Sequence, residues 1–175
     1  MRTFLLVAGV LACVVPVGAQ SPAATPQTSG LHASAADVAA LIEKARARLK
    51  PGQAAVGDWI VKADAAVSAL GAVFPPGHVH LDYLVDVIPN AALVHERRSE
   101  FFYVLDGGGV MLVGGTLRDG TRMNAETWRG SGVDGGTPQR LTKGDVFILP
   151  RGTPHFISEV DAPFVFISLM IPHAE

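Results

Sequence analysis

The sequence predicts an all-β domain preceded by a single α-helix. After Gly52 the chain is a series of short runs rich in β-branched and aromatic residues, separated by Gly, Pro, Asn and Asp. Such runs are typical of strands, and the residues between them are typical of turns. No helical pattern interrupts the series, so we expect antiparallel strands in a sandwich or barrel.

The first segment, residues 1–19, is predicted to be a secretory signal peptide. Arg2 precedes an uncharged apolar run that ends near Val17, and Gly18 and Ala19 supply small residues for cleavage. The run is shorter than the roughly 20 apolar residues of a membrane-spanning helix. We therefore expect an exported protein, periplasmic or secreted, with no membrane contact once the leader is removed.

Composition narrows the possible classes further. Cys13 is the only cysteine of the 175 residues and lies in the predicted leader, so the mature chain depends on its core rather than on disulfides. Lipid attachment at Cys13 is an open alternative. The net charge of −2 provides no positive field for nucleic acid, which is not expected as a partner.

Residues 20–33 are predicted to form a flexible linker, because they offer little apolar surface for burial. A helix is predicted over residues 34–52, with Ser34 as its N-cap and a Lys-Pro-Gly stop at residues 50–52. Its apolar face consists of Val38, Leu41, Ile42 and Leu49. We expect this helix to pack on the outside of a single β domain, residues 53–175.

The β domain contains about eight strand-like runs. They are residues 67–74, 80–88, 91–95, 100–105, 109–115, 145–150, 155–160 and 163–171. The glycine-rich pieces at 107–109 and 132–136 lack the strand and helix context of a phosphate-binding loop, and we interpret them as turns.

Residues 116–141 are polar and rich in Gly and Arg, which predicts a long connection over one end of the domain. Some of its side chains could close over a binding site and hold an anionic or aromatic substrate, or could belong to a solvated loop. These side chains are Arg122, Asn124, Trp128 and Arg129.

Alternation along residues 80–88 assigns the nearby polar residues to one face of a strand. The apolar residues of this segment are Leu81, Tyr83, Val85 and Val87. If they face the core, then His78, His80 and Asp82 face outward. A strand bulge could reverse this assignment.

Three polar residues stand out within the apolar runs. His95 shares a strand face with Leu93. Glu100 opens an aromatic strand, where an unpaired buried carboxylate would be costly, so we expect it to have a partner. His155 ends a Pro-Arg-Gly-Thr-Pro corner at residues 150–154, and turns this dense in Pro and Gly fix the backbone.

These residues have the spacing of known sequence motifs. His95, Glu100 and Gly107 form the pattern H-x4-E-x6-G. Gly144, Pro150, Gly152 and His155 form the pattern G-x5-P-x-G-x2-H. The two patterns resemble the two motifs of the cupin family, and the resemblance covers roughly residues 81–171.

The resemblance implies a cupin-type jelly-roll barrel that holds one divalent metal ion at its mouth, and it implies a homodimer. Carried over by position, the implied metal ligands are His95, Glu100 and His155. The family's first histidine falls on Leu93, which cannot coordinate a metal. Glu159 stands where the family often has an asparagine.

Two imidazoles and one carboxylate form the ligand set that holds Fe(II) with positions open for substrate and oxygen. Zinc and manganese also accept such a set, so the identity of the metal stays open. The alternative is a hydrogen-bonded cluster of the same three residues in a barrel without metal.

The leading hypothesis is an exported cupin that binds one divalent metal and acts on a small organic molecule, as an oxygenase, lyase or isomerase. The mature chain has no cysteine and no serine nucleophile motif. The alternative is a non-catalytic cupin that binds or stores a small molecule at a degenerate metal site, which Leu93 favours.

Overall fold

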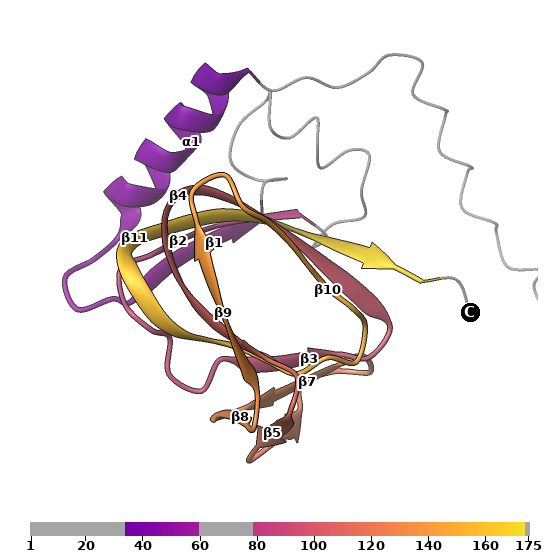
Figure 1. The fold of residues 1–175 in the computed structure, drawn as a ribbon. Helices are drawn as coiled ribbons and strands as arrows, with labels where there is room; N and C mark the ends of the chain where they lie inside the picture. The colour runs from indigo at the N-terminus through magenta and orange to yellow at the C-terminus, as the bar shows by residue number, and fades with distance from the viewer. Residues whose placement is uncertain (1–33, 60–78, 174–175) are drawn as a thin grey trace, which may run out of the picture. The chain divides into compact units, whose positions relative to one another are not determined.

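The computed structural model describes residues 34–59 and 79–173 (Figure 1). The predicted leader, the predicted linker and the predicted strand at residues 67–74 lie outside these ranges. In the part that is described, no helix combines the length and the apolar character needed to cross a membrane.

One helix, α1 (Ala35–Arg48), precedes the strands. Ser34 caps it as predicted: its hydroxyl accepts a hydrogen bond from the backbone N–H of Asp37, and the Asp37 carboxylate accepts one from the backbone N–H of Ser34. This reciprocal capping satisfies two backbone donors at the start of the helix. Leu41 and Ala45 are buried, so the helix has one face that needs a partner.

The strands follow in chain order. They are β1 (Ala55–Trp59), β2 (Val79–Leu84), β3 (Ala92–His95), β4 (Arg98–Val113), β5 (Thr116–Arg118), β6 (Thr121–Arg122), β7 (Thr127–Gly130), β8 (Gly132–Asp134), β9 (Thr137–Thr142), β10 (Val146–Leu149) and β11 (His155–Pro172).

The strands are antiparallel throughout, as predicted. The main sheet has the order β1-β2-β11-β3-β7-β6, and β4 adds pairings with β11, β9 and β10. The two longest strands, β4 and β11, pair along most of their length and curve around the barrel (Figure 1). The strands β5 and β8 form a separate two-stranded sheet.

The interior of the barrel is apolar and aromatic. Phe102, Phe164 and Phe166 belong to one buried cluster, and neighbouring rings pack with their centroids 5.0 to 5.4 Å apart. Phe102 is 4% exposed and Tyr103 is 41% exposed, so Phe102 faces the barrel interior and its neighbour Tyr103 faces outward.

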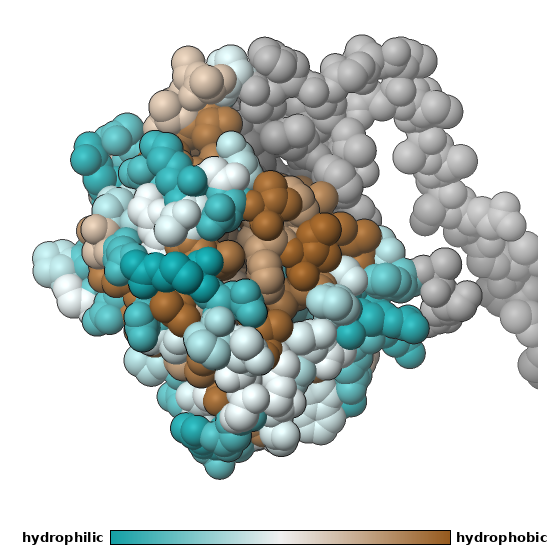
Figure 2. Space-filling model, viewed as in Figure 1, coloured by the Kyte–Doolittle hydropathy of each residue, from teal (hydrophilic) through white to brown (hydrophobic). Residues whose placement is uncertain are grey.

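The outer surface of β4 and β10 carries further apolar residues. Val146 and Ile148 of β10 are more than half exposed, and Val146 pairs with Tyr103 of β4. In the space-filling view of Figure 2, hydrophobic residues in brown gather across the middle of the face in view, with hydrophilic residues in teal around them.

Residues 107–109 were predicted to form a turn, and that prediction is wrong. β4 runs without a break from Arg98 to Val113. A Cβ atom on Gly107 would lie 1.5 Å from the carbonyl oxygen of Pro163, and one on Gly109 would lie 2.4 Å from that of Glu159. These glycines therefore allow β11 to approach β4 closely where β11 bulges.

β11 likewise joins two runs that the sequence suggested were separate, residues 155–160 and 163–171. It spans both as one strand, with register shifts against β4 between Ile157 and Glu159 and again between Asp161 and Val165. The bulges bend the strand without ending it.

The prediction that residues 116–141 form one long connection is also wrong. This segment contains β5 to β8 and nearly all of β9. β7 pairs with β3, and β9 pairs with β4. Of these strands, β5, β6 and β9 are mostly solvent-exposed, so they lack the apolar alternation that identifies a strand in a sequence. The second glycine-rich piece is partly strand, because Gly132–Asp134 forms β8.

The prediction that His80 and Asp82 face outward is also wrong. Leu81 and Tyr83 do form one apolar face of β2, but that face packs against Leu41 and Ala45 of α1. Both His80 and Asp82 line a cavity inside the barrel. His78, which was assigned outward with them, lies outside the described residues.

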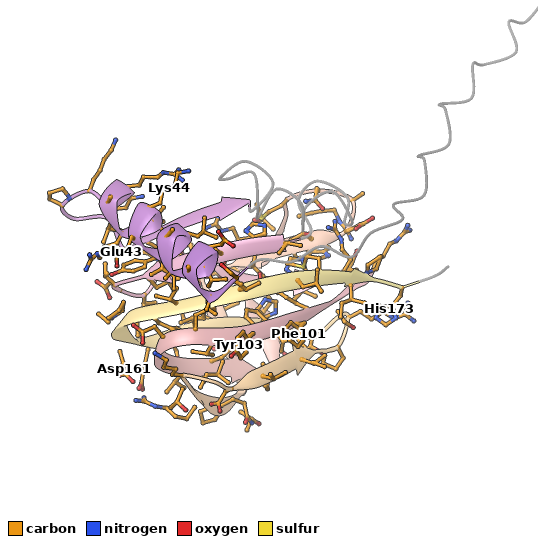
Figure 3. The ribbon with its side chains drawn as sticks, turned by 90° about the horizontal axis from the view of Figure 1, so that it is seen from above. Glu43, Lys44, Phe101, Tyr103, Asp161 and His173 are labelled. Atoms are coloured by element: carbon orange, nitrogen blue, oxygen red, sulfur yellow. The ribbon has the colours of Figure 1, made fainter. Side chains whose placement is uncertain are left out.

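The position of α1 explains why the assignment of strand faces from alternation was wrong for His80 and Asp82. A strand covered on one side by a helix and facing a barrel interior on the other has two buried faces, so its apolar face need not be the inner one. Figure 3 shows α1 lying across the strands, with Glu43 and Lys44 on the helix. Both of these side chains are exposed, as expected for the side of the helix that faces solvent.

Asp82 is affected strongly by this location. Burial, with the negative charge of Glu100 as a second cause, raises the pKa of the Asp82 carboxyl from 3.8 to about 7. The folded state therefore holds a proton that the unfolded state releases at a lower pH, and Asp82 lowers the stability of the protein as the pH rises from about 4 to about 7.

We expect Gly107→Ala to lower the free energy of unfolding by about 3 kcal/mol, because the methyl group meets backbone atoms that cannot move aside. The matched control is Gly135→Ala. Gly135 has φ of 68° against 64° for Gly107, but no atom lies within 4 Å of its Cβ position. The control should lose only about 1 kcal/mol. Equal losses of unfolding free energy for the two variants, measured by urea unfolding, would contradict the close approach of the β11 backbone to Gly107.

We expect Asp82→Asn to stabilise the metal-free protein at pH 8 by about 2–4 kcal/mol. The advantage over the wild type should shrink by about 2 kcal/mol at pH 5, where the wild-type carboxyl is protonated in the folded state. Urea unfolding at the two pH values measures this. Asp86→Asn, at an exposed position, is the control, and the same advantage for Asp82→Asn at both pH values would contradict the buried location.

Candidate metal centre

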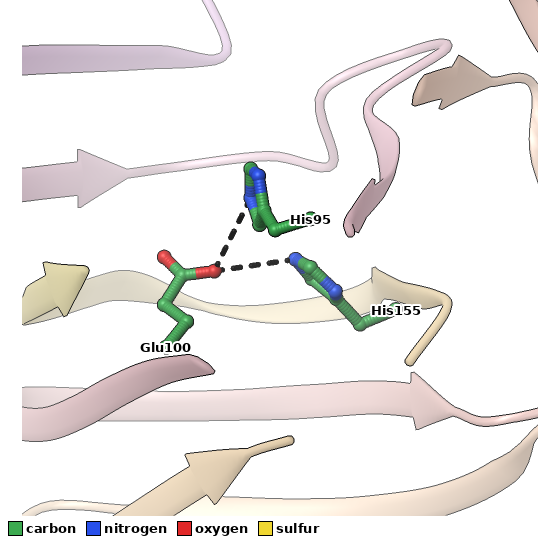
Figure 4. Close-up of side chains that lie close together, drawn as sticks. All are labelled: His95, Glu100 and His155. Atoms are coloured by element: carbon green, nitrogen blue, oxygen red, sulfur yellow. Dashed lines mark ion pairs between the residues drawn. The ribbon is translucent and has the colours of Figure 1, made fainter. Parts of the chain in front are cut away.

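Three side chains from three strands converge inside the barrel (Figure 4). The Oε2 atom of Glu100 lies 3.4 Å from Nε2 of His155 and 3.6 Å from Nε2 of His95. The three ligand atoms all lie within 4.8 Å of one another. The sequence placed these residues in one site, and the structure brings them together.

The turn before β11 fixes two of the three residues with respect to each other. Gly152 adopts φ of 75°, a conformation suited to glycine. Its backbone N–H donates a 2.7 Å hydrogen bond to the carbonyl oxygen of His95. The corner predicted to position His155 is therefore also tied to the end of β3, which carries His95.

Contacts on the far side of each imidazole set its orientation. Nδ1 of His155 lies 3.1 Å from the carbonyl oxygen of Thr153. A carbonyl only accepts, so Nδ1 donates, and the neutral ring then presents the lone pair of Nε2 toward Glu100. Nδ1 of His95 lies 3.2 Å from the hydroxyl of Thr127. Such outer contacts hold the histidine ligands of metal sites in place.

The electrostatics of the cluster favour an ionised carboxylate beside the imidazoles. Burial raises the pKa of the Glu100 carboxyl, but the neighbouring imidazoles of His155 and His95 outweigh this effect and lower that pKa below its usual value. Burial is also the largest cause that lowers the pKa of His95. A neutral imidazole and an ionised carboxylate are the forms that bind a metal.

The polar atoms at the centre of the cluster are incompletely satisfied. Within the described part of the chain, Nε2 of His95 and Oε2 of Glu100 are buried and make no hydrogen bond. Ligand atoms bonded to an ion at about 2.1 Å are themselves about 3 to 3.5 Å apart in octahedral or tetrahedral geometry. The separations around Glu100 fit this spacing, so the three residues are suited to hold one divalent metal ion.

Leu93 occupies the position at which the family's first histidine was expected. It is the direct cross-strand partner of His155, so the two side chains lie side by side on the same face of the sheet. Leu93 also lines the same cavity as His95, which confirms that these two residues share a strand face. The fourth ligand position is therefore filled by an apolar side chain.

Two cavities meet at the cluster. We call the first the apolar cavity; its volume is about 150 Å³, and it is lined mostly by apolar side chains together with Asp82, Glu100 and His155. We call the second the polar cavity; its volume is about 520 Å³, and its lining includes His95, Asn124 and Thr127. Asp82, Leu93 and Glu100 line both.

The side chains proposed to close over the site are mostly engaged elsewhere. Arg122 pairs with Glu96 and lies 4.5 Å above the ring of Trp128, whose Nε1 donates to Glu96. Arg129 donates to the carbonyl oxygen of Asn90. Of the four loop residues, Asn124 lines the polar cavity.

Sequence reasoning missed three residues of the site. Asp82 was assigned to the outside, and Thr127 lay in a segment interpreted as a loop. Ser168 lies in β11 between the apolar residues Ile167 and Leu169, is 3% exposed, lines the polar cavity together with Glu100 and lowers the pKa of that carboxyl. The alternation in β11 was a usable signal, because a serine on the inner face of an apolar strand needs a polar partner.

Comparisons with known proteins agree with the motif assignment. The cupin family matches residues 89–174. No match is found among curated proteins.

Three solved structures illustrate the structural similarity. DMSP lyase DddQ from Ruegeria pomeroyi DSS-3 is 18% identical with a TM-score of 0.43, covering 73% of this chain and 53% of that one. Salicylate 1,2-dioxygenase from Pseudaminobacter salicylatoxidans is 12% identical with a TM-score of 0.46, covering 77% and 32%. KdgF from Halomonas sp. is 21% identical with a TM-score of 0.36, covering 55% and 69%.

The chain spans 53% of the length of the lyase and 32% of the length of the dioxygenase. The family match contains His95, Glu100 and His155 and extends from just before β3 to the end of β11. Over residues 89–174, this chain belongs to the cupin family.

Proposed function

We propose that this protein binds one divalent metal ion through His95, Glu100 and His155 and acts on a small organic molecule held in the barrel. The observation that carries the proposal is the convergence of Nε2 of His95 and Oε2 of Glu100, two buried polar atoms that make no hydrogen bond within the described residues. Buried polar groups in folded proteins are normally hydrogen-bonded or coordinate a metal.

The ligand set supports Fe, Mn or Zn and does not select among them. When bound, such an ion would polarise an oxygen of the substrate or acidify a water molecule. The reaction classes compatible with this chemistry include oxygenases, lyases and isomerases. Two cavities border the ligands, so a bound molecule has space beside the metal position.

The protein's own residues would prepare the site. Thr153 and Thr127 hold the two imidazoles from their far sides. Ser168 lowers the pKa of the Glu100 carboxyl, which favours the ionised form that binds a metal. Because these contacts exist before a metal binds, little ordering is needed on coordination.

A non-catalytic role in binding or storage is the second candidate, and Leu93 favours it. In that case the ligand would be held by the cavity walls, and the three polar residues would only orient it. The two candidates differ in whether the purified protein carries a metal ion.

Two further expectations stay predictions. The apolar run after Arg2 supports export to the periplasm or outside the cell. The exposed apolar residues of β4 and β10, Tyr103, Val146 and Ile148, support a homodimer, since contiguous exposed apolar surface often marks an interface.

We expect the protein, produced with equal amounts of Fe, Mn and Zn, to carry about one metal ion per chain, measured by elemental analysis. His155→Ala should lower the affinity for the metal at least about tenfold. His173→Ala is the control, because His173 follows the end of β11, is exposed and contacts Ser99 rather than the cluster. Undiminished occupancy in His155→Ala, or a metal-free wild type, would refute the proposal.

We expect Leu93→His to increase metal affinity about tenfold or more, because it places an imidazole beside His155 and adds a fourth ligand. The measurement is competition with a chelator of known affinity. Val94→His, on the opposite face of the same strand, is the matched control and should leave affinity unchanged. Equal affinities for the wild type and Leu93→His would show that position 93 does not face the metal.

A further inference from the structure

The apolar cavity contains one polar group that the proposed metal site does not use. Glu100 and His155 face each other across the metal position. Asp82 lines the same cavity from β2 but is not part of the ligand cluster. Among the residues that the structure describes, no hydrogen bond or ion pair to the Asp82 carboxyl is found.

The rest of the cavity wall selects for a compact, apolar body. Phe102, Phe156 and Phe166 contribute aromatic surface, and Leu84, Leu93 and Met111 contribute aliphatic surface. A volume of about 150 Å³ is of the size that accommodates a benzene ring in an apolar cavity. A ligand filling it would have roughly six to eight non-hydrogen atoms.

The carboxyl groups decide what polar group such a ligand carries. Asp82 and Glu100 both line the cavity, so a carboxylate ligand would meet two like-charged neighbours. A hydroxyl or amine hydrogen would instead give the Asp82 carboxyl the hydrogen bond that it lacks within the described residues. Sites built to receive such a hydrogen discriminate strongly against analogues without it.

We propose that Asp82 determines the ligand class of this cavity: a compact, mostly apolar molecule, aromatic in the simplest case, whose hydroxyl or amine donates a hydrogen bond to the Asp82 carboxyl. As an account of substrate choice, the proposal rests on the proposed function, but binding in the cavity can be tested without metal.

The test uses phenol and toluene, which have nearly the same shape and differ in a hydroxyl. Dissociation constants are measured by calorimetry or ligand-observed NMR for the wild type, Asp82→Leu and the exposed control Asp86→Leu. The ratio of phenol affinity to toluene affinity should fall at least about tenfold in Asp82→Leu and stay unchanged in the control. An unchanged ratio in Asp82→Leu, or no binding of either probe to the folded wild type, would overturn the proposal.

A second measurement uses only the wild type, so it does not depend on whether Asp82→Leu folds. The metal-free wild type should bind benzoate at least about tenfold more weakly than phenol, because the carboxylate meets Asp82 and Glu100. Equal binding would overturn the proposal.

Elemental analysis of the same samples separates the two hypotheses. Phenol selectivity in a protein that never takes up metal supports the role of Asp82 and refutes the metal function. Full metal occupancy with no dependence of the phenol ratio on Asp82 supports the metal function and refutes the role of Asp82.

Discussion

The curvature of the β4–β11 pair is the constraint on which the site depends. Glu100 pairs with Met170 near one end of this ladder, and His155 pairs with Val113 at the other end. In a flat ladder these two ends would be about 40 Å apart. The side chains of Glu100 and His155 nevertheless approach to 3.4 Å, so the pair must curl until its ends meet.

Local features of the two strands permit that curvature. The register of β11 shifts between Ile157 and Glu159 and again before Val165, and each bulge increases the local bend and twist. Opposite these bulges β4 has Gly107 and Gly109, at which any side chain would collide with the β11 backbone. A glycine run that carries no ligand group therefore contributes to the candidate metal site by letting the barrel close.

The sequence predicted the site better than it predicted the strands, for physical reasons. Motif spacing located His95, Glu100 and His155. Alternation placed Leu93 on the same strand face as His95, because side chains two residues apart in a strand point the same way. The same reasoning from alternation was wrong for Asp82. There α1 covers the apolar face of β2, and the sequence of a strand does not state which of two buried faces is covered by a helix.

The strand boundaries were predicted least well, because glycine has two uses. At Gly135 the chain turns with positive φ in open space, whereas at Gly107 a similar φ occurs within a strand, against another strand. Only the position of the partner strand distinguishes the two cases. The short strands between residues 116 and 141 were missed for a related reason, since their pairing depends on neighbours remote in sequence and not on apolar alternation.

The replacement of a histidine by Leu93 has two consequences that act in opposite directions. It removes a ligand, which weakens a metal site. It also leaves a three-ligand set of the kind that keeps coordination positions open for a substrate. Because Leu93 lines both cavities, the side chain that replaces a ligand extends the apolar wall up to the metal position. A molecule with an apolar body in the apolar cavity would then lie against Leu93, with Asp82 and the ligand residue Glu100 lining the same space.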